Sequence, residues 1–356
     1  MSERRVTIGR PDDMHVHFRQ GACMTVVVPF TARQFGRAIV MPNTVPYIRT
    51  VDEAAQYRDQ IMTAVPSGVD FTPLMVLYLQ TTMSPDTIRE AKWSGFIHGI
   101  KMYPAGATTN SEGGVVRVQD VEEQLRVMEE VDMPLLIHGE SADPTDDVFR
   151  RETIFYGESF AWLTTTFPKL RISCEHITTK TAVEMIERAP RHLRLGATMT
   201  PQHLMENRNY LLGSGLRPHA FCKPILKAEE DRQALLVAAT SGNPRFFLGT
   251  DSAPHPQHGD AGKAKECDCG CAGCFSAHAA VELYTEAFDK VDALDRLDGF
   301  ASRFGAEFYE LSRNEGTAEL VKETWSAESS YGFDDDNQVV PFRQEVPVRW
   351  RTRTLA

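Results

Sequence analysis

The stretch PDDMHVHFRQG, residues 11–21, joins a short apolar run to two histidines, with aspartates before them and an arginine after them. Its core, DDMHVHF at 12–18, is the first of eight short apolar runs, which are followed by turn signals and helical patterns as βα units should be. The other seven are GRAIVMPN at 36–43, PLMVLYL at 73–79, HGIKMYP at 98–104, PLLIHGE at 134–140, RISCEHI at 171–177, LGATMT at 195–200 and RFFLGTD at 245–251. Eight such units predict an α/β fold, a closed (β/α)8 barrel of the TIM type.

Helical spacing between the runs supports the barrel. Two sets of apolar residues recur at intervals close to 3.6: Val121, Leu125 and Met128 after the fourth run, and Ala182, Met185, Ile186 and Ala189 after the sixth. A doubly wound open sheet is the alternative architecture. No GxGxxG motif follows an early strand to support it.

Composition narrows the classes of function. The chain of 356 residues carries a formal net charge of −11 and no Lys/Arg-rich run, which argues against nucleic acid or an anionic membrane as a partner. The sequence contains neither an apolar run of about 20 residues nor an apolar signal segment at the N-terminus, so we expect a cytoplasmic protein with reduced thiols. We expect one domain over residues 1–356, with a tail from about residue 320 that packs on the barrel and covers its bottom.

Polar residues stand at the C-terminal ends of several runs. They are His15, His17, Asn43, Lys101, His138, His176 and Asp251. In a barrel these ends form one mouth, where active sites lie, so residues more than 200 positions apart would converge there.

The two histidines of the opening stretch form an HxH pattern. Because side chains alternate along a strand, Asp13, His15 and His17 should share one side, with Met14 and Val16 on the other. Neutral imidazoles bind zinc, and Asp13 could orient a ring from behind. The alternative is a pair of polar residues on a solvated strand.

Lys101, flanked by apolar residues at a strand end, is in an unfavourable place for an ammonium ion. It would need a carboxylate partner or would lose its proton, and a neutral amine can react with carbon dioxide to give a carbamate that bridges two metal ions. Together with His138, His176 and Asp251, these residues provide enough ligands for two metal ions. Asp251 would also act as the general base. A buried ion pair of Lys101 is the simpler alternative.

A further set indicates recognition of an anionic substrate. Arg19, Asn43 and His255 offer donors that favour a carboxylate. A surface arginine with an unrelated partner is the alternative for Arg19. The loop AGATTNSEGG at 105–114 is either an ordinary exposed loop or a lid over substrate.

With these residues identified, the chain resembles the short bacterial dihydroorotases of the amidohydrolase superfamily. Ten blocks match in order from about residue 5 to 280: RPDDMHVHFRQG, GRAIVMPN, KMYPAGATTNS, PLLIHGE, EHITTK, ATMTPQHLM, NRN, LRPHAFCKPILK, FLGTDSAPH and CGCAGCF. The resemblance implies reversible cyclisation of the small molecule N-carbamoyl-L-aspartate to L-dihydroorotate in pyrimidine biosynthesis, by a homodimer.

The resemblance also implies a set of site residues. His15, His17 and Asp251 would hold one zinc ion and His138 and His176 the other, with N6-carboxylated Lys101 and a hydroxide bridging the two. Asp251 would take a proton from the attacking hydroxide and return one to the leaving nitrogen. The residues implied to contact substrate are His17, Arg19, Asn43, Thr108, Thr109, His138, Lys223, His255 and Ala272.

Two features depart from this pattern or leave it open. Position 223 carries lysine where the family is expected to have leucine, at a residue whose backbone touches substrate. The cluster CDCGCAGC at 267–274 has the spacing of a separate structural zinc site, but the same block occurs in the family as a loop near the active site.

Two other functions remain as alternatives. A hydantoinase or allantoinase would use the same metal cage with different recognition residues, and Arg19, Asn43 and the loop at 105–114 argue against it. A non-catalytic barrel kept as a structural subunit would require lost ligands, and none is missing.

Overall fold

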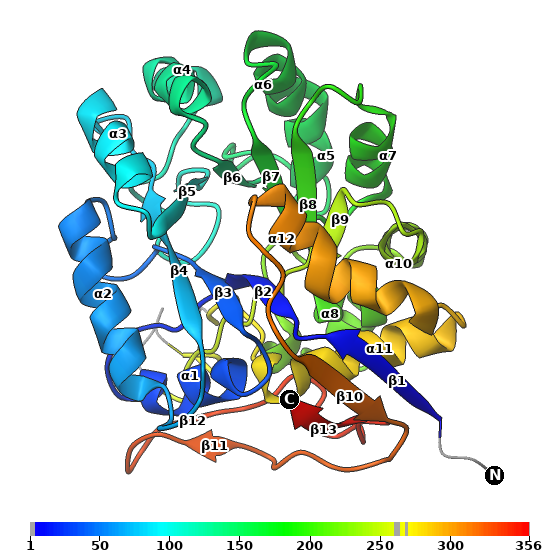
Figure 1. Ribbon diagram of the computed structural model, residues 1–356. Coiled ribbons are helices and arrows are strands. Elements are labelled where there is room, and N and C mark those ends of the chain that lie inside the picture. Colours follow the sequence, from blue (N-terminus) through cyan, green and yellow to red (C-terminus); the bar gives the residue numbers. More distant parts are fainter. Residues whose placement is uncertain (1–3, 260–263, 268–269, 356) are drawn as a thin grey trace.

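The computed structural model describes residues 4–259, 264–267 and 270–355. At its centre eight parallel strands form one sheet, in which each strand pairs with the next along the chain (Figure 1). They are β2 (Asp12–Val16), β3 (Arg37–Val40), β4 (Thr72–Tyr78), β5 (Ile97–Met102), β6 (Leu135–His138), β7 (Ile172–Glu175), β8 (Leu195–Met199) and β9 (Phe246–Leu248). Six of the eight predicted runs contain one of these strands in full, and β4 and β5 each begin one residue before the predicted run.

The sheet closes between its first strand and the segment that follows its last strand. The Asp251 amide donates to the His15 carbonyl at 2.8 Å, and the His17 amide donates to the Ser252 carbonyl at 3.0 Å. A barrel without free edges results, as predicted. The same bonds bring Asp251 beside the two histidines of the opening stretch.

Helices surround the barrel, most of them against the outside of the strands (Figure 1). They are α1 (Met24–Ala32), α2 (Val51–Ala64), α3 (Pro85–Trp93), α4 (Glu122–Val131), α5 (Arg151–Phe155), α6 (Ala161–Thr166), α7 (Lys180–Arg188), α8 (Pro201–Met205), α9 (Arg208–Leu212), α10 (Glu229–Thr240), α11 (Ala280–Lys290) and α12 (Phe304–Phe308). Thr50 begins α2 with a capping box to Glu53, and Ser84 and Thr179 cap α3 and α7. Among the residues described, no helix is long and apolar enough to cross a membrane.

The helical pattern predicted after the sixth run is confirmed with one change at its end. Ala182 and Ile186 are buried against the barrel on α7 and Met185 packs on the same core. The helix ends at Arg188, so Ala189 lies just beyond it.

The strict alternation of side chains predicted for β2 is wrong at Met14. Asp13 pairs with Ala38 and Val16 pairs with Val40, so two residues, Met14 and His15, oppose a single residue of β3. This is a β-bulge. Met14 therefore joins the apolar cluster inside the barrel with Leu74 and Phe247, where the strict alternation placed it outside.

The bottom of the barrel is closed by α12 and not by the tail. Phe304 belongs to the inner cluster, and the Arg171 guanidinium, which precedes β7, donates to the Phe308 carbonyl. Beside the barrel, the tail pairs with the N-terminal strand in a second sheet, which consists of β1 (Arg5–Gly9), β10 (Thr317–Val321) and β13 (Arg351–Leu355). A hairpin of β11 (Tyr331–Gly332) and β12 (Gln338–Val339) then reaches the loop after β9, where the Gln257 amide donates to the Gln338 carbonyl.

A substitution at Gly305 of α12 tests whether this helix packs tightly against the bottom of the barrel. A Cβ at that position would lie 2.7 Å from Met14 Cγ, so we expect Gly305→Val to lower the free energy of unfolding by about 1–3 kcal/mol through overpacking. Gly157→Ala is the control, because a Cβ there meets no atom within 4 Å. Denaturant unfolding of both variants measures the difference, and equal stabilities would contradict a tightly packed plug.

Candidate active site

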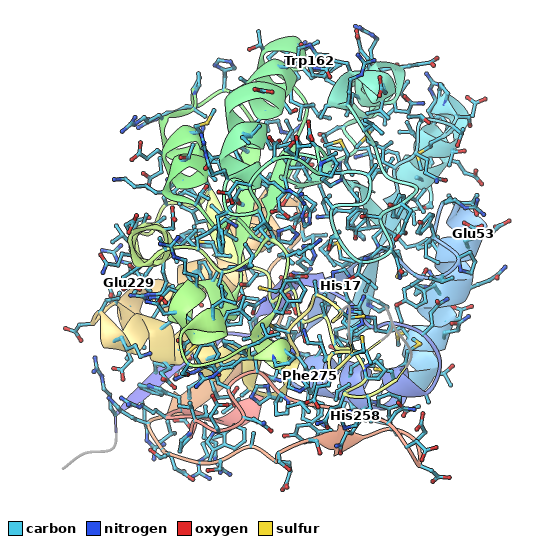
Figure 2. All side chains as sticks on the ribbon, turned by 180° about the vertical axis from the view of Figure 1, so that it is seen from behind. His17, Glu53, Trp162, Glu229, His258 and Phe275 are labelled. Atoms are coloured by element: carbon cyan, nitrogen blue, oxygen red, sulfur yellow. The ribbon has the colours of Figure 1, made fainter. Side chains whose placement is uncertain are left out.

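The histidines of the opening stretch meet Asp251 at the mouth of the barrel. His17 Nε2 lies 3.1 Å and His15 Nε2 lies 3.4 Å from the same carboxylate oxygen of Asp251. All three residues are buried, and Figure 2 shows His17 near the middle of the molecule, within the surrounding helices. Among the residues described, they are the one group of three whose possible ligand atoms all lie within 4.8 Å of one another.

A second pair of imidazoles adjoins the first. The ring centroid of His176 lies 4.9 Å from that of His15 and 4.6 Å from that of His138. Lys101 projects from β5 on the same inner side and is 0% exposed. The structure therefore brings together all six residues that the sequence assigned to a metal site.

Several nitrogens in this group are buried and make no hydrogen bond. They are His15 Nε2, His176 Nδ1 and Lys101 Nζ. A buried polar atom that makes no hydrogen bond costs about 1–3 kcal/mol, so such atoms mark a place where a ligand belongs. Imidazole and carboxylate donors are those that zinc prefers, and the residues present fit the metal.

The electrostatics keep these groups in states that can bind a metal. Burial lowers the pKa values of the four imidazoles at positions 15, 17, 138 and 176, so they are neutral at pH 7. Burial also lowers the pKa of Lys101 to about 8, although Glu175 and Asp251 oppose the shift. A fraction of this lysine is thus a free amine near neutral pH.

Asp251 is ionised at the centre of the group. Burial alone would raise its pKa, but the hydrogen bond from His17 and the neighbouring imidazoles outweigh burial and lower the pKa to about 2. The carboxylate is therefore in its acceptor form at neutral pH.

The partner of the His15 ring differs from the prediction. His15 Nδ1 donates to Glu175 Oε2 at 2.5 Å, and Thr198 donates to the same oxygen at 2.9 Å. Asp13 orients no ring, because its carboxylate accepts from the Thr250 amide at 2.8 Å and from the Thr250 hydroxyl at 2.7 Å. Asp13 thereby fixes the segment that carries Asp251.

Three of the predicted residues have left-handed backbone conformations. Their φ angles are 59° at Arg19, 40° at His176 and 44° at Asp251. Such angles are unfavourable for residues with a Cβ and often occur where a fold holds a functional side chain in place. At His176 the amide is held by the Thr198 hydroxyl at 2.7 Å.

Arg19 and His255, both predicted to contact an anionic substrate, lie in contact with each other beside this group. Arg19 Nε donates to the Pro254 carbonyl at 2.8 Å, and its Nη2 donates to His255 Nε2 at 2.8 Å. Both residues, with His17 and Asn43, line a cavity of about 650 Å³. The tail hairpin contributes Phe333 to the same cavity, which the sequence did not predict.

The loop at 105–114 lies over the mouth. Asn43 donates to the Thr109 carbonyl at 3.0 Å, and the Thr109 hydroxyl donates to the Ala272 carbonyl at 3.3 Å. The Thr108 amide donates to Ser111 within the loop. The contact between Thr109 and Ala272 joins this loop to the loop that follows β9, on the opposite side of the mouth.

Lys223 adjoins the group through its backbone neighbours. His203 Nε2 donates to the Pro224 carbonyl at 2.9 Å, which ties this segment to α8. The Lys223 side chain is half-buried, and its charge, with that of Lys227, favours ionisation of Glu140.

The cysteine cluster shows no second metal cage among the described residues. Cys267, Cys271 and Cys274 do not form a group of three with ligand atoms within 4.8 Å of one another. Lys265 instead occupies the centre of this loop, where its ammonium donates at 2.8 Å to the carbonyls of Phe221, Cys271 and Gly273. Cys269, the remaining cysteine of the cluster, lies outside the described residues.

Two glutamates next to the histidines were missed by the sequence analysis. Glu175 holds the His15 ring, and Glu140 Oε2 lies 2.7 Å from His138 Nε2. Both stand at strand ends, as CEH and HGE, so the signal that selected the histidines could have selected these carboxylates.

Comparison with known proteins places the chain in one group. The model of the amidohydrolase family matches residues 9–322. A dihydroorotase of Pseudomonas aeruginosa is 52% identical over 347 residues, which make up 98% of this chain and 97% of that protein. The dihydroorotase of Saccharomyces cerevisiae, solved in complex with 5-fluoroorotic acid, is 32% identical with a TM-score of 0.90 over 98% of both chains. A dihydroorotase of Campylobacter jejuni is 33% identical with a TM-score of 0.88 over 99% of both chains.

Proposed function

The chain belongs to the amidohydrolase family, among its dihydroorotases, and from this premise we propose that its barrel mouth interconverts N-carbamoyl-L-aspartate and L-dihydroorotate on two zinc ions. One observation carries the proposal. The cluster of His15, His17 and Asp251 opens beside a cavity that Arg19 and His255 line. A site for hydrolysis thus adjoins a site for a carboxylate.

We propose that His15, His17 and Asp251 would hold one ion, that His138 and His176 would hold the other, and that Lys101 would bridge them after carboxylation. When bound, the two ions would lower the pKa of a water molecule and polarise the amide carbonyl. The support is the set of buried nitrogens without partners, Lys101 Nζ among them. A free amine is the form of lysine that reacts with carbon dioxide, and burial of Lys101 favours it.

Asp251 transfers the protons in both directions of the reaction. In the hydrolytic direction, the Asp251 carboxylate takes the proton of the attacking water and passes it to the departing ring nitrogen. In the biosynthetic direction, Asp251 takes the proton from the ureido nitrogen as the C–N bond forms. It passes this proton to the departing hydroxyl of the carboxyl group, which leaves as water. One carboxylate that is ionised at neutral pH can serve both directions.

Substrate is held by groups around the cavity. Arg19 binds the carboxylate with its fork of N–H donors, and His255 and Asn43 complete this contact. Thr108 and Thr109 close over the substrate with their loop, and the backbone at Lys223 and Ala272 lines the opposite side. The structure solved with 5-fluoroorotic acid, a pyrimidine carboxylic acid, is consistent with this choice of ligand.

The proposal is tested with cyclic amides that differ in one feature. The zinc-loaded protein should hydrolyse L-dihydroorotate, and should hydrolyse dihydrouracil, which lacks the carboxylate, with a much lower kcat/KM. Efficient turnover of dihydrouracil, hydantoin or allantoin in place of dihydroorotate would assign the mouth to another cyclic-amide hydrolase. No turnover of any of them by fully metallated protein would favour a structural subunit.

Arg19→Lys tests the contact to the carboxylate. Lysine keeps the charge but loses the bidentate fork, and a charged hydrogen bond contributes about 1.5–3 kcal/mol, so kcat/KM for dihydroorotate should fall by about 10–150-fold. Zinc content should not change. Arg188→Lys, at an exposed position on α7, is the matched control. An Arg19→Lys variant with wild-type KM for dihydroorotate would remove Arg19 from the substrate site.

Three expectations stay predictions. The protein is predicted to form a homodimer, to be cytoplasmic and to consist of a single domain over residues 1–356. Sedimentation of the zinc-loaded protein measures the first of these.

A further inference from the structure

Glu140 stands directly behind one of the proposed zinc ligands. It follows His138 by two residues at the end of β6, and its amide donates to the His138 carbonyl at 3.1 Å. The residue between them is Gly139, where a Cβ would lie 3.0 Å from the Tyr156 ring, a tight contact. The turn folds the Glu140 side chain back onto His138.

The contact between the two side chains is short and buried. Glu140 Oε2 lies 2.7 Å from His138 Nε2, and the two residues are 2% and 1% exposed. A carboxylate only accepts hydrogen bonds, so against an ionised Glu140 the proton of a neutral His138 ring lies on Nε2. The other ring nitrogen, Nδ1, then keeps the free lone pair.

The ring of His15 is held through Nδ1, whereas the ring of His138 is held through Nε2. His15 Nδ1 donates to Glu175 Oε2 at 2.5 Å, which leaves Nε2 toward Asp251 at 3.4 Å. The two histidines come from strands on different sides of the mouth, β2 and β6. Each therefore has its own buried carboxylate, on opposite ring nitrogens.

We infer that Glu140 is a positioning residue of the zinc site, which fixes the His138 ring and presents Nδ1 to one ion, as Glu175 presents His15 Nε2 to the other. This inference rests on the proposed function, because it requires the binuclear site. Carboxylates behind metal-bound histidines orient the ring and raise its basicity, and their loss typically lowers metal affinity by about 10–100-fold. Glu140 does not line the cavity beside Arg19 and His255.

The test measures zinc affinity by competition with a coloured chelator, in variants that keep one ion at a time. His17→Asn weakens the first site and leaves the ion held by His138, whereas His138→Asn leaves the ion held by His15 and His17. Adding Glu140→Gln should lower the affinity of the remaining zinc by about 10–100-fold in the His17→Asn protein and leave it unchanged in the His138→Asn protein. Glu175→Gln should show the opposite pattern.

A general effect on folding would lower both affinities together, so the selectivity separates positioning from structure. Glu158→Gln, at an exposed position nearby, is the control and should change neither affinity. Glu140→Ala is a second variant with a larger expected loss in the His17→Asn protein. Equal affinity of the remaining zinc with and without Glu140→Gln in that protein would overturn the inference. Failure of the proposed function would appear earlier, as a wild-type protein that does not bind two zinc ions.

Discussion

Asp251→Asn is expected to lower kcat for L-dihydroorotate hydrolysis by about 10²–10⁴-fold, the usual contribution of a general acid–base group. Asparagine has nearly the same shape but cannot accept the proton of the attacking water. The structure gives this carboxylate a central place, because one of its oxygens lies 3.1 Å from His17 Nε2 and 3.4 Å from His15 Nε2. The measurement is initial rate by absorbance at saturating substrate.

Zinc occupancy must be held equal for this comparison, because Asp251 is also a proposed ligand. Both proteins are assayed in excess zinc, and bound zinc is measured in the same samples. If Asp251→Asn at full occupancy keeps a kcat within about 10-fold of wild type, Asp251 is not the proton acceptor.

Lys101→Met is expected to abolish activity without destabilising the metal-free protein. Methionine fills the space of the side chain, and the Nζ atom that it removes makes no hydrogen bond in its buried position. Burial of an unpaired polar group is unfavourable, so the free energy of unfolding should stay equal or rise. Loss of the bridging carbamate should lower kcat by about 10²–10³-fold or more and reduce the zinc bound per chain.

Lys265→Met is the matched control for this prediction. Lys265 is also buried, but its ammonium donates to three carbonyls, so its removal should cost about 1–3 kcal/mol of stability. The same two measurements, denaturant unfolding and zinc content, apply to both variants. A Lys101→Met protein that keeps wild-type activity and two zinc ions would leave Lys101 as a buried lysine without a bridging role.

The strands and the convergence of the site residues could be predicted from the sequence because both depend on local pattern. Each apolar run has a length typical of a buried strand, and several carry a polar residue at or near the C-terminal end. Once the runs form a parallel barrel, the ends of β2, β5, β6 and β7 must meet at one mouth. His15 and Asp251 could thus be placed together although 236 positions separate them.

The details that could not be predicted depend on contacts between distant segments. The bulge at Met14 and His15 arises from pairing with β3, which no local pattern in β2 records. Asp13 was assigned to a histidine ring because it lies nearby in sequence, but closure of the barrel brings Thr250 to its carboxylate. The closure of the barrel bottom by Phe304 and its neighbours likewise follows from tertiary packing.

The most direct test of the account is a zinc titration of the metal-free protein in bicarbonate buffer, with the rate of L-dihydroorotate hydrolysis measured at each step. The account predicts a rate that reaches its plateau at two zinc ions per chain, with the mass of one carbon dioxide added to the protein at Lys101. A plateau at one zinc ion, or fully metallated protein that leaves dihydroorotate unchanged, would contradict it.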